Sequence, residues 1–318
     1  MIEVIEAGRL TSIQDRGRPG LERFGVPPGG AADWFAGAVA NRLVGNQGHA
    51  ALLEVTAIGP TLRFHRDATI GISGGEHSVF EESAKALSWR TSGIPAGSLL
   101  RFGQVGPGFR SYIAIRGGID VPIVLASRSL CARGGFGGGF GRPLRTGDLL
   151  AVGDLTAAEP MTQAWPSSHR LANRGPWEVR VIAGPHTEAF GPDALDRLSN
   201  TACLVTPAID RMGLRLQTPA LHLQPHEIVT TPVCAGAIQL TPSGELIVLL
   251  ADHPTTGGYP VIATTISADL PLLAQARPGD TVRFRRVDAS TAAMARRRLL
   301  DWLKLGGENS YDLSERLN

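Results

Sequence analysis

The chain has 318 residues, of which 43% are hydrophobic and 19% are charged. This length predicts about two domains, and the composition supplies enough apolar side chains for their cores, so long disordered stretches are not expected. With 31 basic and 29 acidic residues the formal net charge is only +2, which excludes the large excess of positive charge that nucleic-acid binding requires.

Lysine and cysteine are rare, and this restricts the chemistry. The only lysines are Lys85 and Lys304, so no lysine lies in a phosphate-binding loop and no Met-Lys-Met site for covalent biotin exists. Cys131, Cys203 and Cys234 are well separated and show no CxxC spacing, so neither a disulfide framework nor a zinc site is expected. The acidic, strand-like start and the lack of an apolar run of about 18 residues predict a cytoplasmic protein.

Short apolar runs bounded by glycine, proline and other turn residues recur along the chain. They have the length of β-strands, and their flanks are typical of turns. These runs are 69–72, 99–102, 112–115, 149–152, 179–183, 247–250 and 281–284. The sequence therefore predicts a mainly β fold, and closing such short strands into barrels would remove their exposed edges.

Helix signals are fewer, and each expected helix has a capping residue before it. The expected caps are Asp33, Pro192-Asp193, Ser267 and Ser290. The last helix, 291–305, is the longest and is expected to end at Gly306. Its basic residues lie in its second half, where the helix dipole favours positive charge, and they form either a solvated face or a docking surface for another subunit.

Three short patterns of the first half recur in the same order in the second half. Residues 4–8, 13–18 and 147–150 resemble 181–184, 209–215 and 279–282, respectively. The repetition predicts two related β units joined by a polar segment with alanine, proline and serine. The expected boundaries are 1–156 for a first unit with an N-terminal helical insertion, 157–176 for the connector, 177–287 for the second unit and 288–318 for a C-terminal helix and tail.

Three patterns suggest chemistry that their context does not support. Gly71-Ile-Ser-Gly-Gly75 fits the GxSxG nucleophile pattern, but the alternating residues after it predict a hairpin instead of the required helix. Glycines dominate 134–141, yet no Lys-Ser or Lys-Thr follows, which favours a loop near a contact between subunits over a nucleotide loop. Pro225 between His222 and His226 argues against a shared helix face, so no metal site is expected.

The best candidate site follows the apolar run 245–251, where Asp252 leads into the segment 255–259, Thr-Thr-Gly-Gly-Tyr. A carboxylate can orient or deprotonate water, threonine hydroxyls can donate to an oxyanion or a phosphate, and glycine amides can approach the same group closely. The alternative is a structural turn with Tyr259 in the core. The expected catalytic residues are Asp252, Thr255 and Thr256, and the expected substrate-binding residues of this segment are Gly257, Gly258 and Tyr259.

Two arginines in otherwise apolar surroundings complete the expected site. A guanidinium can hold a substrate carboxylate through two hydrogen bonds, and Arg18 and Arg211 are the expected groups. For each arginine, a structural ion pair with a nearby aspartate is an equally supported alternative. Gln239 is also expected to bind substrate. His253 is a weak candidate for an acid or base, and a surface histidine is the favoured interpretation.

The motifs of the chain together resemble one protein family. The second half carries the strings GAIQ, LLAD, TTGGYP, SADLP, LAQ and PGD, and the first half carries matching patterns at 14–18, 40–46, 116–122, 127–129 and 141–142. Many motifs in one order over 1–286 are a far more specific signal than any single short pattern. The chain is similar to the carboxyltransferase-type family known as the C subunit of 5-oxoprolinase, KipI antagonist or allophanate hydrolase subunit 2.

The resemblance implies two cyclophilin-like β-barrel domains and a subunit of the ATP-dependent enzyme that opens 5-oxoproline to glutamate. It also implies two partners from the same enzyme, its separate A subunit together with its shorter, KipI-like B subunit, so the isolated chain is expected to be inactive. ATP is expected to be shared with a partner because this chain lacks a phosphate-binding lysine. The chain departs from the family at Leu130 and Phe140, where a hydroxyl and an acidic residue are expected, and this argues against ligand binding by the glycine-rich loop.

Two other functions share the same motifs and stay open. One is a carboxyltransferase unit of urea carboxylase or allophanate hydrolase type, which would need biotin on a carrier in trans. The other is a regulatory protein that sequesters a kinase inhibitor, as the antagonist name implies. Fold alone does not decide among these functions.

Overall fold

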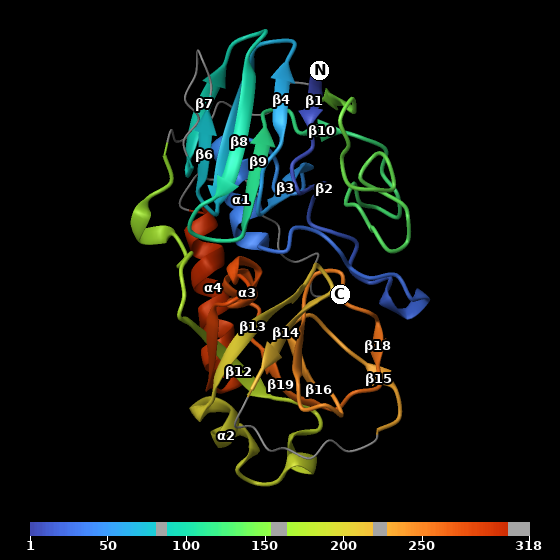
Figure 1. The fold of residues 1–318 in the computed structure, drawn as a ribbon, viewed down its shortest axis with the longest axis vertical. Coiled ribbons are helices and arrows are strands. Elements are labelled where there is room, and N and C mark those ends of the chain that lie inside the picture. The colour runs from blue at the N-terminus through green and yellow to red at the C-terminus, as the bar shows by residue number, and fades with distance from the viewer. Residues whose placement is uncertain (81–87, 154–163, 219–227, 305–318) are drawn as a thin grey trace. The chain divides into compact units, whose positions relative to one another are not determined.

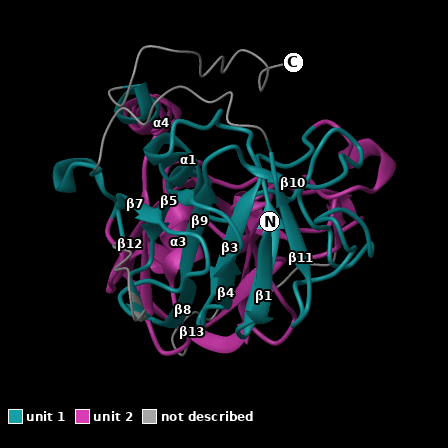
Figure 2. Ribbon diagram, turned by 90° about the horizontal axis from the view of Figure 1, so that it is seen from above, with its two compact units in different colours: residues 1–19, 29–171, 300–318 teal, residues 20–28, 172–299 magenta. Residues whose placement is uncertain are grey.

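The computed structural model of the chain describes residues 1–80, 88–153, 164–218 and 228–304 (Figure 1). The chain forms two compact units (Figure 2). Unit 1 comprises residues 1–19, 29–171 and 300–318, and unit 2 comprises residues 20–28 and 172–299. The short segment 20–28, with the 3-10 helix η1 (Glu22–Phe24), therefore belongs to unit 2 although unit 1 precedes and follows it in the sequence.

Unit 1 contains two antiparallel sheets. One has six strands in the order β10-β11-β1-β4-β8-β6, and the other has five in the order β2-β3-β9-β5-β7. The strands of the first sheet are β1 (Ile2–Glu6), β4 (Thr61–Phe64), β6 (His77–Phe80), β8 (Leu99–Val105), β10 (Ile119–Asp120) and β11 (Leu149–Val152). Those of the second are β2 (Leu10–Gln14), β3 (Leu52–Thr56), β5 (Ala68–Gly74), β7 (Arg90–Ile94) and β9 (Arg110–Ile115).

The two sheets of unit 1 share one hydrophobic core. Side chains alternate across β3, so Leu53 and Val55 join the cluster that both sheets contribute to, whereas Leu52 packs in a second cluster with α1 (Trp34–Leu43). The helix α1 begins after Asp33, whose Oδ1 accepts a hydrogen bond of 2.8 Å from the Ala36 amide. This confirms the predicted cap. The unit also contains the 3-10 helix η2 (Ser167–His169).

Unit 2 is built around a closed barrel of strands in the order β12-β19-β16-β17-β14-β13-β20. The barrel strands are β12 (Trp177–Ala183), β13 (Ala202–Ile209), β14 (Gly213–Gln217), β16 (Ala237–Leu240), β17 (Leu246–Leu249), β19 (Val261–Thr265) and β20 (Thr281–Arg286). A small sheet of β15 (Thr231–Pro232) and β18 (Thr256–Gly257) accompanies it. The barrel closes through parallel pairing of β12 with β20, and the inward side chains of both strands, such as Val179 and Phe284, fill its core.

The helices of unit 2 are short except for the last. They are the 3-10 helix η3 (Thr187–Phe190), α2 (Ala194–Asn200), α3 (Leu270–Gln275) and α4 (Ala289–Lys304), of which α4 continues into residues of unit 1. Two predicted caps are wrong. Helix α4 begins at Ala289 because the Asp288 carboxylate accepts from the Thr291 amide at 2.7 Å, and Ser290 only donates to Asp288. Helix α3 begins after Asp269 instead of Ser267.

One repeated sequence pattern has the same structure in both units. In each copy a glycine with positive φ precedes an aspartate, Gly147 (88°) before Asp148 and Gly279 (91°) before Asp280. Each aspartate accepts a hydrogen bond from the arginine amide three residues earlier, at 2.7 Å in unit 1 and 2.9 Å in unit 2. The repetition therefore reflects one turn used twice, with glycine supplying the left-handed residue.

The predicted mainly β fold class is confirmed by these sheets, the barrel and the short helices with α4 near the C-terminal end. The division of the sequence at 157–176 stays a prediction, since part of that segment lies outside the described residues. Within the described ranges, no helix combines the length and the apolar character needed to cross a bilayer.

Candidate functional site

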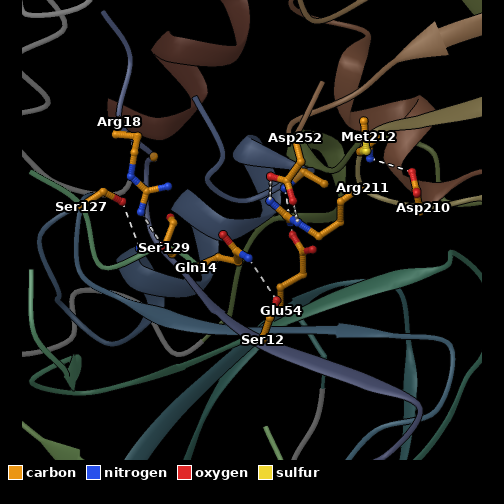
Figure 3. Close-up of polar contacts among 12 residues, drawn as sticks. Ser12, Gln14, Arg18, Glu54, Ser127, Ser129, Asp210, Arg211, Met212 and Asp252 are labelled. Carbon is orange, nitrogen blue, oxygen red and sulfur yellow. Dashed lines mark hydrogen bonds and ion pairs between the residues drawn. The ribbon is translucent and has the colours of Figure 1, made fainter. Parts of the chain in front are cut away.

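Arg211 and Asp252 meet just beyond paired strand ends in unit 2. Strands β14 and β17 run antiparallel with Gly213 opposite Leu249, so Arg211 before β14 and Asp252 after β17 lie on the same rim. The Asp252 amide donates to the Arg211 carbonyl at 2.8 Å. Two charge-assisted hydrogen bonds of 2.8 Å, from Arg211 Nε and Nη2, reach the two carboxylate oxygens of Asp252 (Figure 3).

Burial makes this ion pair more than a surface contact. The two side chains are only 8% and 11% exposed, so bulk water contributes little to the compensation of their charges. The sequence assigned Asp252 to proton chemistry and Arg211 to a substrate carboxylate as separate roles. The geometry joins them, and a substrate carboxylate that bound Arg211 through the same edge would have to displace Asp252.

His253 is buried, which corrects the expectation of a surface histidine. Only 3% of its surface is exposed. Its Nδ1 lies 2.7 Å from the Pro254 carbonyl oxygen and donates a hydrogen bond to it. The ring is therefore held by the backbone at the start of the segment that follows Asp252.

The segment after His253 is partly a strand. Thr256 and Gly257 form β18, Thr256 is exposed, and the Thr255 carbonyl accepts from Val233 at 3.1 Å. Gly258 is also exposed, and Tyr259 is 42% exposed, so this tyrosine is not a core residue. Thr256, Gly258 and Tyr259 therefore lie at the surface of unit 2, whereas Thr255 and Gly257 are half-buried.

Gln239 packs beside Gly257 and supports the candidate segment. The Gln239 side chain is buried, and its Nε2 donates to the Tyr259 carbonyl at 3.2 Å. A Cβ on Gly257 would lie 2.4 Å from the same nitrogen, so the end of the Gln239 side chain would have to move. Gln239 thus holds the segment through the backbone of Tyr259.

Arg18 lies in unit 1, whereas the other predicted site residues lie in unit 2. Its Nη2 donates to the Ser129 carbonyl (Figure 3). Its guanidinium also lies 5.1 Å from the centre of the Phe136 ring. The side chain is almost fully buried. These contacts favour the structural alternative for Arg18 over a role in binding substrate.

Asp15 organises the surroundings of Arg18. Its Oδ1 accepts hydrogen bonds from the Gly17 amide and the Ser127 hydroxyl, each at 2.7 Å, and from the Ser129 hydroxyl, while Oδ2 accepts from the Arg128 amide at 2.6 Å. The sequence patterns at 14–18 and 127–129 therefore form one buried polar node, the Asp15 node, defined by Asp15, Ser127 and Ser129.

A second buried network in unit 1 was not predicted. Glu54 on β3 accepts from the Ala32 amide at 2.8 Å and from the Tyr112 hydroxyl at 3.0 Å. The Tyr112 hydroxyl in turn accepts from the Asp33 amide at 2.7 Å. Burial and the nearby charges of Glu54 and Asp33 raise the pKa of Tyr112 well above its ordinary value, so it stays a proton donor. The lone glutamate inside the apolar run 51–56 is the sequence signal that could have pointed to this network.

The serine of the GxSxG pattern is structural. Ser73 lies in β5, fully buried, and its hydroxyl donates to the Ala36 carbonyl of α1. The rejection of a nucleophile elbow is supported, because a strand and not a helix follows. The expected hairpin is wrong, since β5 pairs with β7 and β9 whereas β6 pairs with β8 in the other sheet.

His77 pairs with a serine as well, but inside the core. Its Nδ1 lies 3.2 Å from the Gly103 carbonyl oxygen and its Nε2 contacts the hydroxyl of Ser111. Ser111 is fully buried in β9, so the pair offers no path for a substrate. Burial lowers the pKa of His77 to about 4, against a contrary effect of the hydrogen bond to Gly103.

This depressed pKa predicts a pH dependence for unit 1. Because the unfolded state takes up a proton near pH 6.5 and the folded state only near pH 4, the free energy of unfolding should fall by up to about 3 kcal/mol as pH is lowered across that window. Urea unfolding from pH 7 to pH 4 measures the slope. His77→Gln should flatten it, whereas His49→Gln, at an exposed histidine of the same unit, should not. An unchanged slope in His77→Gln would contradict the assignment.

Metal-ligating side chains do not gather in the described parts of the chain, where no group of three or more histidines, cysteines or acids is close enough to share an ion. His222 and His226 lie outside the described residues.

Comparison with known proteins assigns the chain to a family. Residues 24–286 match the model of the carboxyltransferase domain, subdomain A and B. The C subunit of the Escherichia coli 5-oxoprolinase is 34% identical over 93% of this chain and 94% of its own length. The urea amidolyase of Lachancea kluyveri is 33% identical over 89% of this chain but only 17% of its own length.

A solved structure agrees with these sequences. The urea carboxylase of Kluyveromyces lactis superimposes with a TM-score of 0.90 and 33% identity over 97% of this chain, which spans 29% of that longer chain. The match in sequence and the match in fold extend over nearly the same residues. This chain therefore belongs to the family of the carboxyltransferase domain, subdomain A and B.

Proposed function

We propose that this chain is the C subunit of an ATP-dependent 5-oxoprolinase, and that it helps to open 5-oxoproline to glutamate in a complex with the B and A subunits. The observation that carries the proposal is the extent of the match. The alignment with the C subunit of the E. coli 5-oxoprolinase spans 93% of this chain and 94% of that protein, whereas the L. kluyveri urea amidolyase is matched over 17% of its length. A match over both whole lengths supports a shared role better than a shared domain does.

The chemistry explains why the rim in unit 2 needs help from a partner. The lactam of 5-oxoproline is a resonance-stabilised amide with a poor leaving group, and ATP would supply a phosphoryl group to activate its carbonyl oxygen. The rim offers Arg211, which is bound to Asp252, and the exposed hydroxyl residue Thr256. One paired arginine is too little positive charge for a triphosphate, so the proposed ATP site is shared with another subunit.

Within this proposal the residues of the rim position the substrate and stabilise charge. Asp252 holds the Arg211 guanidinium in a fixed orientation, and Arg211 faces the negative charge of the substrate. Thr255, Thr256 and the amides of Gly257 and Gly258 donate to the oxyanion. His253 is buried, and its Nδ1 donates to the Pro254 carbonyl and holds the start of this segment in place.

The isolated chain should show no ATP-dependent cleavage of 5-oxoproline, because it lacks the rest of the active site. The measurement is glutamate and inorganic phosphate release by the purified chain alone, and then with the co-expressed B and A subunits. Turnover should appear only in the second case. Robust turnover by the chain alone, or none by the complete mixture, would each contradict the proposal.

A second function is favoured by one observation, the TM-score of 0.90 with the K. lactis urea carboxylase. In that case the chain would be a carboxyltransferase subunit that receives a carboxyl group from biotin on a separate carrier. Avidin capture of a biotinylated partner together with carboxyl transfer to urea would support this function. Glutamate formation from 5-oxoproline without biotin would support the first.

A further inference from the structure

The glycine-rich loop of unit 1 forms a single left-handed turn. Gly137, Gly138 and Gly139 have φ values of 73°, 59° and 75°, and the Gly141 amide donates to the Gly137 carbonyl at 2.8 Å. Side chains would oppose such a turn because the left-handed conformation brings Cβ close to the following carbonyl oxygen. The glycines therefore encode a defined shape, which sets this loop apart from a merely flexible connection.

Only some of the backbone amides of this turn have a hydrogen-bond acceptor. The Gly138 amide donates to the Arg128 carbonyl at 3.0 Å, and the Gly141 amide is also bonded. Among the described residues, the amides of Gly137, Gly139 and Phe140 have no acceptor. Gly137 is buried, whereas Gly139 and Phe140 are exposed, so the amides of the last two residues are open to water or to a ligand. Several such amides in one turn make a natural site for a negatively charged oxygen.

These three amides adjoin a hollow of about 220 Å³. Its walls are Pro122, Val124, Phe136, Phe140 and the glycines of the loop. This volume is below the roughly 300–1,000 Å³ of sites for drug-sized ligands, which excludes a nucleotide. The hollow thus combines apolar and aromatic walls with donors, and it suits a small molecule that has both an acceptor group and an apolar body.

The charged residues next to Phe140 form a balanced ion pair. The Arg142 guanidinium lies 5.0 Å from the centre of the Phe140 ring, and it binds Asp148 through two hydrogen bonds of 2.8 Å. Asp148 is buried, so the ion pair holds Arg142 at the ring. Phe140 itself is 37% exposed at the mouth and carries no charge that would repel an acid.

We propose that this hollow binds a small cyclic carboxylic acid. The carboxylate accepts hydrogen bonds from the amides of Gly137, Gly139 and Phe140, and the ring packs against Phe136 and Phe140. Phe140 does not argue against a ligand, as the sequence alone suggested, because it supplies an apolar wall. The site follows from this geometry, and only the choice of 5-oxoproline as the probe rests on the proposed function.

Amide NMR of the full chain labelled with 15N-glycine and 15N-phenylalanine tests the site. Addition of 5-oxoproline should shift the amide signals of Gly137, Gly139 and Phe140 downfield in a saturable way. The signals of Gly138 and Gly141, whose amides are already bonded, should stay unchanged. 2-Pyrrolidone has the same ring without the carboxylate, and acetate has the carboxylate without the ring, so each should bind at least about tenfold more weakly.

A pair of matched variants tests the role of the mouth. Phe140→Glu places a carboxylate there and should weaken binding of 5-oxoproline at least about tenfold by repulsion. Phe24→Glu makes the same change at a phenylalanine of unit 2 that is 66% exposed, and it should leave the affinity unchanged. The proposal is wrong if 5-oxoproline gives no saturable shift at these amides, or if 2-pyrrolidone or acetate binds equally well.

The NMR test of this site and the activity test of the proposed function can fail independently of each other. Saturable binding at these amides with no 5-oxoproline cleavage by the reconstituted complex would remove the proposed function and leave the site standing. Cleavage by the complex with no amide shifts in this chain would do the reverse.

Discussion

Asp252→Ala should lower the free energy of unfolding of unit 2 by about 3 kcal/mol, because the change removes the carboxylate that accepts two hydrogen bonds from the buried Arg211 guanidinium. The two groups share two hydrogen bonds of 2.8 Å, and side-chain exposures of 8% and 11% leave little room for water to replace the lost partner. Urea unfolding followed by hydrogen exchange at the amides of β14 and β17 measures the loss within this unit.

A second ion pair on the same strands is the control. Arg215 on β14 and Glu245 just before β17 lie 3.0 Å apart, but their side chains are 45% and 39% exposed. Glu245→Ala should therefore cost less than about 1 kcal/mol. Equal losses from the two variants would show that burial does not give the Arg211–Asp252 pair its importance.

A double variant separates the structural part of this pair from its proposed part in catalysis. Arg211→Met with Asp252→Leu replaces the buried pair by apolar side chains, and this should recover most of the stability. Assayed in the reconstituted complex, the double variant should still be at least about 100-fold less active, because the oriented guanidinium is gone. Recovered stability with full activity would remove the pair from the proposed site.

The sequence predicted what local chemistry determines. Apolar runs between turn residues became strands, and the Asp33 side chain caps α1 as expected because its acceptor amide lies only three residues away. The wrong cap of α4 has a competing aspartate nearby, because Asp288 lies two residues before Ser290 and its carboxylate accepts from the Thr291 amide. Helix α3 is different, since Asp269 precedes it without capping it through its side chain and binds Arg180 instead. A short-range pattern shows that a helix begins, but it does not identify the residue at which the helix begins.

Contacts between residues far apart in the sequence could not be predicted from it. It identified Arg211 and Asp252 but not their pairing across 41 positions, and it assigned Gly257 to a ligand without showing that the Gln239 side chain packs beside this glycine. Glu54 is bonded to Tyr112, which is 58 positions away, so its environment depends on strand register that no single pattern encodes. The sequence thus predicted which residues matter better than it predicted the residues that they contact.

Gly137→Ala should destabilise unit 1 by about 4 kcal/mol, far more than Gly135→Ala in the same loop. The two glycines have φ values of 73° and 68°, so an alanine at either position bears a similar conformational cost of about 1–2 kcal/mol. Only the surroundings differ. A Cβ on Gly137 would lie 2.1 Å from the Ser129 carbonyl oxygen, whereas a Cβ on Gly135 would meet nothing within 4 Å.

The additional cost at Gly137 comes from the Asp15 node. The Ser129 carbonyl accepts a hydrogen bond from the almost fully buried Arg18, so moving this oxygen weakens a charge-assisted bond worth about 1.5–3 kcal/mol besides straining the packing. Urea unfolding of the two variants, with hydrogen exchange at the Gly17 and Arg128 amides that bind Asp15, measures both effects. Equal destabilisation by the two substitutions, with these amides still protected, would mean that the loop does not support the node. A large difference would mean that the left-handed turn holds Arg18 and Asp15 in place, and that the shape of the hollow is maintained by the same contacts.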